Sequence, residues 1–239
     1  MSGPVALVGS GEFLEVMRPI DAALLAGRPR RAVFLPTAAA LDGEETVDYW
    51  IELGTRHYAA LDVEPVPLRV VNREDAERHD YAAQIAGAGL IYLSGGNPGY
   101  LADTLRDTAV WRAIVAAFDS GTALAGCSAG ACALSAIARD FRNPGRYAGR
   151  GLGIVPELAV IPHFDRFVTF APDLVGDLLA LIDENTTLVG IDEDTAILRG
   201  PDHWVVEGRQ TATVIGRDGA RSRFTAGETL DLTTHAPAD

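Results

Sequence analysis

Small residues surround one serine near the middle of the chain. Residues Ala125 to Ala131 have the sequence Ala-Gly-Cys-Ser-Ala-Gly-Ala, with Ser128 at the centre of a Gly-x-Ser-x-Gly spacing. The segment lies between an apolar run and an alanine-rich stretch. In a nucleophile elbow, this spacing allows a sharp turn from a strand into a helix, which exposes the serine hydroxyl at the end of the sheet. Ser128 is therefore the candidate nucleophile of an acyl-transfer reaction.

Backbone N–H groups beside an elbow can stabilise negative charge on a substrate oxygen. Ala129 follows the serine at the predicted start of a helix, so its N–H is one candidate donor. A second glycine turn, Leu-Ser-Gly-Gly-Asn at Leu93 to Asn97, follows another apolar run. Glycine lets a backbone approach a substrate closely. We therefore predict an oxyanion hole formed by Gly96 and Ala129.

A serine nucleophile needs a base that a third group holds in place. His163 is the best placed of the five histidines, because it follows the apolar run Leu158 to Ile161 and Pro162. It thus leaves a predicted parallel strand at the carboxyl edge, where the elbow also lies. We predict that His163 is the base.

Acidic residues follow the last of the predicted parallel strands. Asp192, Glu193 and Asp194 come directly after Leu188 to Ile191. Strand alternation places Glu193 on the face opposite the two aspartates, and we predict that Glu193 orients the base. The order Ser, His, Glu differs from the Ser, acid, His order of the α/β hydrolases. Ser128, Glu193 and His203 would satisfy that other order, so His203 is an alternative base.

Other local motifs predict no cofactor. Gly9-Ser10-Gly11 begins like a dinucleotide-binding fingerprint, but Leu14 stands where the third glycine belongs. No Cys or His cluster has metal-ligand spacing, so no metal is expected. Cys127 occupies the position before the nucleophile and would point into the support of the elbow, as a small buried side chain.

The candidate residues need a sheet to hold them at one edge. Short apolar runs alternate with helical patterns over about the first 190 residues, which is typical of a parallel sheet covered on both faces. Asp42, with Glu45 three residues later, is predicted to cap one of the helices. The predicted strands are Val5 to Val8, Ala32 to Leu35, Val63 to Val70, Leu90 to Leu93, Ala123 to Gly126, Leu158 to Ile161 and Leu188 to Ile191.

The pattern changes after Thr195, where short apolar pieces alternate with turns such as Gly-Pro-Asp and Arg-Asp-Gly. These pieces predict an antiparallel β appendage over about residues 196–232. The appendage is too small for a core of its own, so residues 1–239 are predicted to form a single domain. The segment Arg139 to Arg150, rich in arginine and glycine, predicts a long loop near the site.

Charge and composition exclude several classes of protein. The chain has 239 residues and a formal net charge of −13, which repels nucleic acid and anionic membranes. No apolar stretch is long enough to span a membrane, and Met1 to Ser10 lacks the features of a secretory signal. The two cysteines, Cys127 and Cys132, are too few for a disulfide framework. These features together predict a cytoplasmic protein.

Taken together, the motifs resemble the serine peptidase family of dipeptidase E and cyanophycinase, which has the fold of class I glutamine amidotransferases. The resemblance covers nearly the whole chain and implies a three-layer α/β/α sandwich with a mainly parallel central sheet. Its landmarks, in the order of the family, are ALVGSGE (6–12), FLPTA (34–38), LSGGN (93–97), AGCSAGA (125–131), GLGIV (151–155), His163 with Phe164, and GIDEDTA (190–196).

The resemblance implies that Ser128 is the nucleophile, His163 the base and Glu193 the third member. It implies cofactor-free hydrolysis of a small peptide or isopeptide near an aspartyl residue, through an acyl-enzyme. Asn97 and Arg166 are the matching candidates for substrate binding. The partner of a substrate carboxylate is either Arg166 or an arginine of the loop Arg139 to Arg150. A homodimer is compatible with the resemblance.

Two branches of the family are represented in the motifs. GLGIV and GIDEDTA are more similar to the cyanophycinase branch, whereas Asn97 and Pro98 after the paired glycines are closer to the dipeptidase form.

Two other functions are compatible with the same elbow. One is an esterase or acyl transferase, and the other is a catalytically silent protein that binds a small ligand in the glycine-lined pocket.

Overall fold

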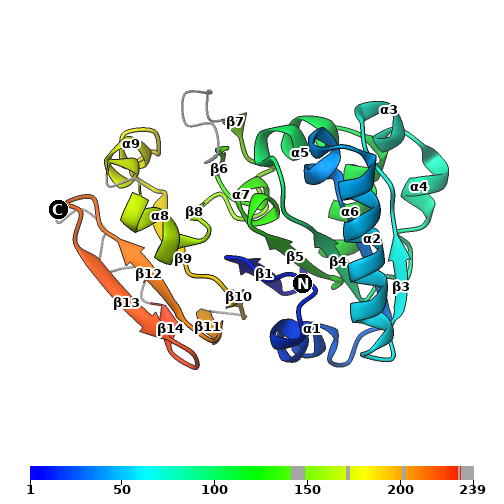
Figure 1. The fold of residues 1–239 in the computed structure, drawn as a ribbon, viewed down its shortest axis with the longest axis horizontal. Helices are drawn as coiled ribbons and strands as arrows, with labels where there is room; N and C mark the ends of the chain where they lie inside the picture. Colours follow the sequence, from blue (N-terminus) through cyan, green and yellow to red (C-terminus); the bar gives the residue numbers. More distant parts are fainter. Residues whose placement is uncertain (141–148, 171–172, 201–202, 231, 233–239) are drawn as a thin grey trace.

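A large and a small β-sheet lie side by side in the protein (Figure 1). The computed structural model describes residues 1–140, 149–170, 173–200, 203–230 and 232. The large sheet has eight strands in the order β14-β11-β10-β1-β5-β4-β2-β3. These strands are β1 (Val5–Val8), β2 (Arg31–Leu35), β3 (Glu64–Pro67), β4 (Leu90–Leu93), β5 (Ala123–Cys127), β10 (Thr195–Arg199), β11 (Trp204–Gly208) and β14 (Thr229–Leu230).

Strands β1 to β5 of the large sheet are parallel to their neighbours, and β10, β11 and β14 continue the sheet beyond β1 in antiparallel fashion. The small sheet has the order β13-β12-β9-β8, and only β8 and β9 are parallel within it. Its strands are β8 (Leu158–Ile161), β9 (Thr187–Ile191), β12 (Thr211–Ile215) and β13 (Arg221–Thr225). A two-stranded ladder joins β6 (Ile137–Ala138) to β7 (Gly149–Arg150).

Alternate residues of the central strands pack into two different cores, because successive side chains of a strand point to opposite faces. In β1, Val5 and Leu7 belong to the core beneath α5, α6 and α7, whereas Ala6 and Val8 belong to the core beneath α1 and α2. The helices are η1 (Glu15–Met17), α1 (Arg18–Leu25), η2 (Thr37–Asp42), α2 (Glu44–Ala59), α3 (Arg73–Ala76), α4 (His79–Ala83), α5 (Pro98–Leu105), α6 (Ala109–Asp119), α7 (Ala129–Leu134), α8 (Phe164–Phe170) and α9 (Leu174–Leu179). This layered arrangement confirms the predicted α/β fold with a mainly parallel central sheet.

The predicted strands divide between the sheets in a way that the sequence analysis did not anticipate. The sequence predicts β8 and β9 in the same parallel sheet as β1 to β5, but β8 pairs with β9, and β9 pairs with β12, in the small sheet. Strand β10 pairs directly with β1 and extends the large sheet, whereas β12 pairs with β9 and extends the small sheet. Antiparallel strands therefore belong to both sheets. The chain passes from β9 to β10 through only three residues, 192–194. Local apolar patterns identify strands but not their partners, which is why the division was missed.

Two local predictions were wrong in detail. The strand predicted at Val63 to Val70 is limited to β3, because Pro65 and Pro67 have no N–H to donate and fit only an edge strand. Helix α2 begins after Gly43, which has a φ of 101°, and its N-cap makes no side-chain hydrogen bond. Asp42 ends η2 instead of capping α2, because the glycine turn separates the two helices.

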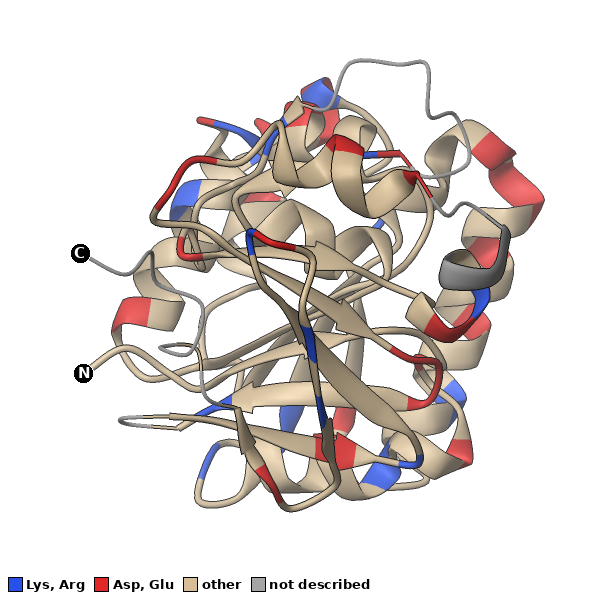
Figure 2. Ribbon diagram, turned by 90° about the vertical axis from the view of Figure 1, so that its left-hand side faces the viewer, with Lys and Arg blue, Asp and Glu red and all other residues tan. Residues whose placement is uncertain are grey.

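Charged residues are distributed over several parts of the fold. Figure 2 shows acidic and basic positions mainly on helices, turns and strand ends, with acidic positions in many separate places. Within the described ranges, none of the helices has the length and apolar character needed to cross a bilayer.

Candidate active site

The elbow predicted at Ser128 is present between β5 and α7. Ser128 has φ 50° and ψ −105°, a conformation that costs energy for a residue with a side chain. A Cβ on Gly126 would lie 2.5 Å from the backbone of Gly130, and a Cβ on Gly130 would lie 2.1 Å from the Leu93 carbonyl oxygen. The two glycines of the motif therefore allow the strand, the turn and the following helix to pack closely.

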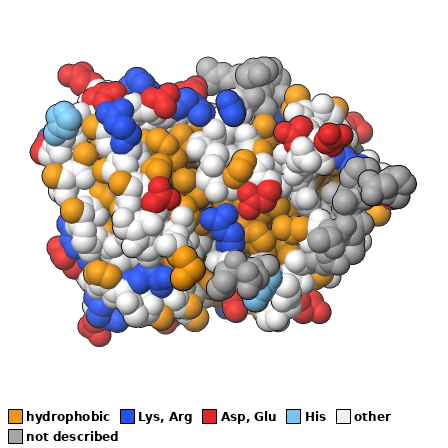
Figure 3. All heavy atoms as spheres, turned by 180° about the vertical axis from the view of Figure 1, so that it is seen from behind, with side chains coloured by type: hydrophobic (Ala, Val, Ile, Leu, Met, Phe, Trp, Pro, Cys, Tyr) orange, Lys and Arg blue, Asp and Glu red, His pale blue; other side chains and the backbone are white. Residues whose placement is uncertain are grey.

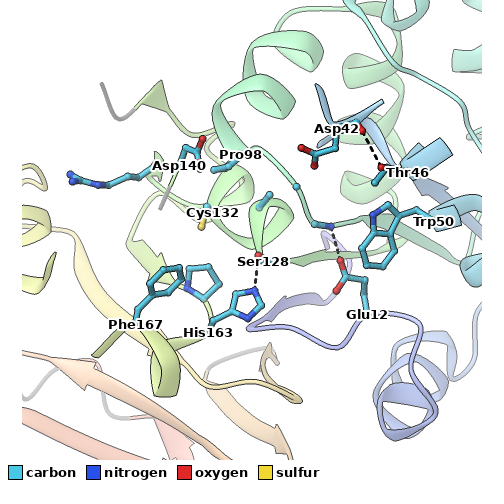
Figure 4. Close-up of a pocket in the computed structure, with 15 residues that line it drawn as sticks. Glu12, Asp42, Thr46, Trp50, Pro98, Ser128, Cys132, Asp140, His163 and Phe167 are labelled. Carbon is cyan, nitrogen blue, oxygen red and sulfur yellow. Dashed lines mark hydrogen bonds between the residues drawn. The ribbon is translucent and has the colours of Figure 1, made fainter. Parts of the chain in front are cut away.

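The structure brings Ser128, His163 and Glu193 into one hydrogen-bonded line. The Ser128 Oγ lies 3.1 Å from His163 Nε2 (Figure 4), and His163 Nδ1 lies 3.0 Å from Glu193 Oε1. The hydrogen bond with His163 and the charge of Arg166 lower the pKa of Glu193, so this carboxylate is ionised and only accepts hydrogen bonds. The Nδ1 atom then carries the proton, which leaves Nε2 free to accept the serine proton.

The members of this line come from different elements. His163 follows β8, has a φ of 49°, and directly precedes α8. Glu193 lies in the short connection between β9 and β10, where Asp165 accepts its N–H at 3.0 Å and Gln210 donates to its carbonyl at 2.9 Å. Glu193 is thus held through both its main chain and its carboxylate.

Two residues with backbone N–H groups, Gly96 and Ala129, lie beside Ser128. In the turn after β4, the N–H of Ser94 donates to Leu35 and that of Asn97 donates to Ala38. Within the described part of the chain, the hydrogen bonds include no acceptor for the N–H of Gly96 or Ala129. Both residues line the cavity beside Ser128. Gly96 has a φ of 140°, and a Cβ there would lie 2.2 Å from the Ala38 carbonyl oxygen.

The cavity beside Ser128 has a volume of about 370 Å³, which suits a small molecule. Apolar rings form part of its wall, and acidic side chains outnumber basic ones around it (Figure 4). The lining residues outside the elbow, the Gly95–Gly96 turn and His163 are Glu12, Asp42, Thr46, Trp50, Pro98, Cys132, Arg139, Asp140, Pro162 and Phe167.

Comparison with known families identifies the group to which this architecture belongs. The model of Peptidase family S51 matches residues 5–205, which is most of the chain. The chain belongs to Peptidase family S51. This membership confirms the resemblance to the dipeptidase E and cyanophycinase family.

Two cyanophycinases are similar in sequence to this S51 protein over about three quarters of its length. A cyanophycinase of Geminocystis herdmanii is 28% identical over 194 residues, which cover 77% of this chain and 66% of the relative. A cyanophycinase of Nostoc is 27% identical over 76% of this chain and 61% of the relative. This S51 chain therefore spans less than two thirds of the length of these relatives.

Solved structures of peptidases are similar to this chain in fold. The crystal structure of a peptidase from an acI-B1 Actinobacterium has a TM-score of 0.88 and 37% sequence identity, covering 97% of this chain and 98% of that one. A putative peptidase E of Listeria monocytogenes has a TM-score of 0.66 at 17% identity, covering 88% of this chain and 100% of that one. The second likeness concerns the fold alone.

The two predicted substrate-binding side chains of this S51 protein lie outside the cavity wall. Asn97 Oδ1 accepts the N–H of Tyr100 and caps α5, and its Nδ2 donates to Asp140 at 2.8 Å. Arg166 lies 3.2 Å from Glu193 Oε2, and 67% of its side chain is exposed. Asn97 thus holds a helix and a neighbouring aspartate, and Arg166 contacts the acid of the hydrogen-bonded line.

The alternative base is contradicted by the topology of the S51 fold. His203 directly precedes Trp204, which pairs with Arg199, and Arg199 pairs with Val5 at the start of β1. Ser128 follows Cys127, which pairs with Val8 at the end of β1. His203 therefore lies near the end of the sheet where β1 starts, whereas Ser128 lies near the end where β1 finishes.

The cysteines of this S51 member are both buried and free. Burial raises the pKa of Cys127 well above its ordinary value and also raises that of Cys132. Cys127 lies behind the elbow, as predicted. The sequence analysis missed Cys132, which lines the cavity one helical turn after Ser128.

Arg139, Asp140 and Glu12 also contribute to the wall of the cavity in this S51 protein. The central part of the loop predicted at Arg139 to Arg150, residues 141–148, lies outside the described residues, whereas Arg139 and Asp140 line the cavity. The sequence analysis also missed the buried carboxylate of Glu12, although Glu12 ends one of the family landmarks. Its signal was an acidic residue directly after a strand and a Gly-Ser-Gly turn.

Proposed function

We propose that this S51 member is a serine peptidase that hydrolyses a small peptide or isopeptide bond near an aspartyl residue. The observation that carries the proposal is the line Ser128 to His163 to Glu193, at hydrogen-bond distances. It lies beside a cavity lined by two residues whose N–H groups have no acceptor among the described residues. Nucleophile, base, orienting acid and oxyanion donors are the parts that acyl transfer requires.

The proposed reaction has two steps. His163 Nε2 takes the proton of Ser128 as its oxygen attacks the scissile carbonyl carbon, and the resulting oxyanion is bound by the N–H groups of Gly96 and Ala129. The imidazolium, stabilised by Glu193, then donates the proton to the leaving amine, and the acyl-enzyme forms. Water attacks the ester in the second step, with His163 again as base, and releases Ser128.

The substrate class is supported by the names of the relatives and by the cavity. Cyanophycinases are among the similar proteins, which favours a bond near an aspartyl residue. Arg139, not Arg166, is the arginine of the cavity wall within the described ranges. We therefore propose Arg139 as the partner of a substrate carboxylate, for which the guanidinium fork is suited.

The test measures amine release from a panel of α-aspartyl dipeptides, β-aspartyl-arginine, cyanophycin and a simple ester. Wild type is compared with Ser128→Ala and with Ser120→Ala, whose hydroxyl is exposed at the end of α6 and donates to Ala116. We expect turnover of one peptide class by wild type and Ser120→Ala, and a loss of about 10⁴-fold or more in Ser128→Ala.

A serine-directed phosphonate and intact-mass analysis provide a second measurement. Labelling of Ser128 in wild type supports the proposed nucleophile. Turnover of the ester alone would assign an esterase or acyl transferase in place of a peptidase. If wild type hydrolyses nothing and is not labelled, the protein binds a ligand without catalysis and the proposal is wrong.

Location and assembly stay predictions of the sequence. We propose a cytoplasmic location and homodimer formation, and neither follows from the site. On the face drawn in Figure 3, hydrophobic side chains lie exposed among charged ones. Sedimentation of the purified chain measures the state of assembly directly.

A further inference from the structure

Glu12 is a buried carboxylate to which the reaction described above assigns no role. It lies in the connection after β1, and 6% of the residue is exposed. Its Oε1 accepts the N–H of Gly95 at 2.7 Å (Figure 4), and its Oε2 accepts the S–H of Cys127 at 2.9 Å. A carboxylate removed from water is costly unless it is hydrogen bonded, and here both oxygens are used.

One partner of Glu12 adjoins the first donor of the proposed oxyanion hole, and the other lies two residues before the second donor. Gly95 is bonded through its carbonyl carbon to the nitrogen of Gly96, so its orientation sets the direction of the Gly96 N–H. Cys127 precedes Ser128, which precedes the second donor, Ala129. Glu12 therefore connects the turn after β4 with the elbow after β5 through one side chain.

Glu12 differs from the other groups that hold this turn. The N–H groups of Ser94 and Asn97 donate to main-chain carbonyls of Leu35 and Ala38. The N–H of Gly95 donates to a side chain, so its acceptor can be changed by mutation. A Cβ on Gly95 would lie 2.7 Å from Glu12 Oε1 and 3.5 Å from the Ser128 Cβ. The carboxylate, the glycine and the nucleophile are thus in close contact.

We propose that Glu12 is a positioning residue, which fixes the Gly96 and Ala129 donors relative to each other. The inference rests on the proposed function, because it needs an oxyanion to be bound. It assigns Glu12 no contact with substrate. A carboxylate beside a cavity can also attract a substrate cation, but both oxygens of Glu12 already accept hydrogen bonds from the protein.

Three substitutions of Glu12 distinguish the effect of its side-chain length from the effect of its negative charge. Glu12→Gln keeps the length of the side chain and an oxygen that can accept from Gly95, but it loses the charge. Glu12→Asp keeps the charge but is one methylene shorter and does not reach Gly95. Glu12→Ala loses both properties. Cys127→Ser is the matched control, because it keeps a donor for Oε2.

The positioning role predicts a specific order of activities. Glu12→Gln and Cys127→Ser are expected to stay within about threefold of wild type, whereas Glu12→Asp and Glu12→Ala lose about ten- to a hundredfold in kcat with little change in KM. The affinity for a peptide aldehyde built on the best panel substrate should fall in parallel with kcat, because its hemiacetal oxygen occupies the oxyanion hole.

Hydrogen exchange of the peptide covering residues 93–97 adds a readout that needs no turnover. The positioning role predicts faster exchange in Glu12→Ala and Glu12→Asp than in wild type and Glu12→Gln. Thermal melting, recorded for every variant, shows whether a lost activity reflects unfolding. Exchange that is the same in wild type and Glu12→Ala overturns the inference, whatever the activity.

The remaining outcomes distinguish the two proposals. An active Glu12→Asp beside a Glu12→Gln with a raised KM would mean that the charge binds substrate, and the inference would be wrong. If wild type neither turns over the panel nor reacts with the phosphonate, the proposed function fails. The exchange measurement then decides alone whether Glu12 fixes the turn.

Discussion

Two histidine–carboxylate pairs occur in different parts of the described chain. One joins His163 Nδ1 to Glu193 at 3.0 Å, with about a third of each side chain exposed. The other joins His57 Nε2 on α2 to Asp21 on α1 at 2.7 Å, and its side chains are 0% and 3% exposed. The two pairs contain the same functional groups, yet only the first lies beside a cavity and a serine.

The surroundings decide what each pair can do. The rings of Phe13 and Tyr58 lie 5.8 and 5.1 Å from the His57 ring, and burial raises the pKa of Asp21 although the hydrogen bond with His57 opposes this rise. In the other pair, the hydrogen bond with His163 and the charge of Arg166 lower the pKa of Glu193. A histidine–carboxylate pair is thus a catalytic candidate only where its second nitrogen meets a nucleophile at an open surface.

The largest effect is expected when the exposed pair is broken. Glu193→Gln removes the charge that stabilises the imidazolium and the proper tautomer of His163, so kcat should fall by about 10²- to 10⁴-fold. The urea midpoint should change little, because the pair is partly exposed. Steady-state kinetics and urea unfolding on the same preparation check both statements, and a variant with near-normal kcat would remove Glu193 from the proposed mechanism.

Breaking the buried pair should lower the stability of the protein and leave kcat nearly unchanged. Asp21→Ala leaves His57 in the core without its carboxylate partner, and the free energy of unfolding should fall by about 3 to 5 kcal/mol. The kcat of the folded fraction should stay within about threefold of wild type. Urea unfolding and active-site titration with the phosphonate measure the two quantities, and a stable but inactive variant would contradict the comparison.

The smallest effect is expected from a change at Arg166, whose charge lowers the pKa of Glu193 in the partly exposed pair. Arg166→Gln removes a positive charge that lowers the pKa of Glu193, so this pKa should rise toward its ordinary value of 4.5. A carboxyl group with a lowered folded-state pKa stabilises the protein above its ordinary pKa and loses this contribution as the pH falls through the folded-state value.

The stability lost in Arg166→Gln should therefore be greatest above about pH 5 and should shrink on acidification to about pH 3. Because Arg166 is mostly exposed, the difference should stay below about 1 kcal/mol. Urea unfolding from pH 3 to pH 7 measures it. A difference that grows toward low pH would show that Arg166 acts through another group.

The candidate nucleophile, base and acid could be predicted from the sequence because each has a local signature. The elbow needs glycines on both sides of Ser128, and His163 and Glu193 each lie two residues after the end of an apolar strand. Residues that act through distant contacts had no such signature. Glu12 meets Gly95 and Cys127 only in the folded chain, and the cap and aspartate contacts of Asn97 depend on α5 and on Asp140.

The fold shows the same limit. The α/β layers follow from the alternation of apolar strands and helical patterns, which any segment displays on its own. The division into two sheets depends on which strands meet, as in the antiparallel pairing of β10 with β1 and of β9 with β12. The early end of β3, in contrast, could have been predicted from Pro65 and Pro67.

The line from Ser128 to Glu193 crosses the boundary between the two sheets. The nucleophile follows a strand of the large sheet, the base follows a strand of the small sheet, and the acid lies where the chain passes from one to the other. The hydrogen-bonded line can therefore form in a newly made chain only after Glu193 has been synthesised and the strands of both sheets have paired.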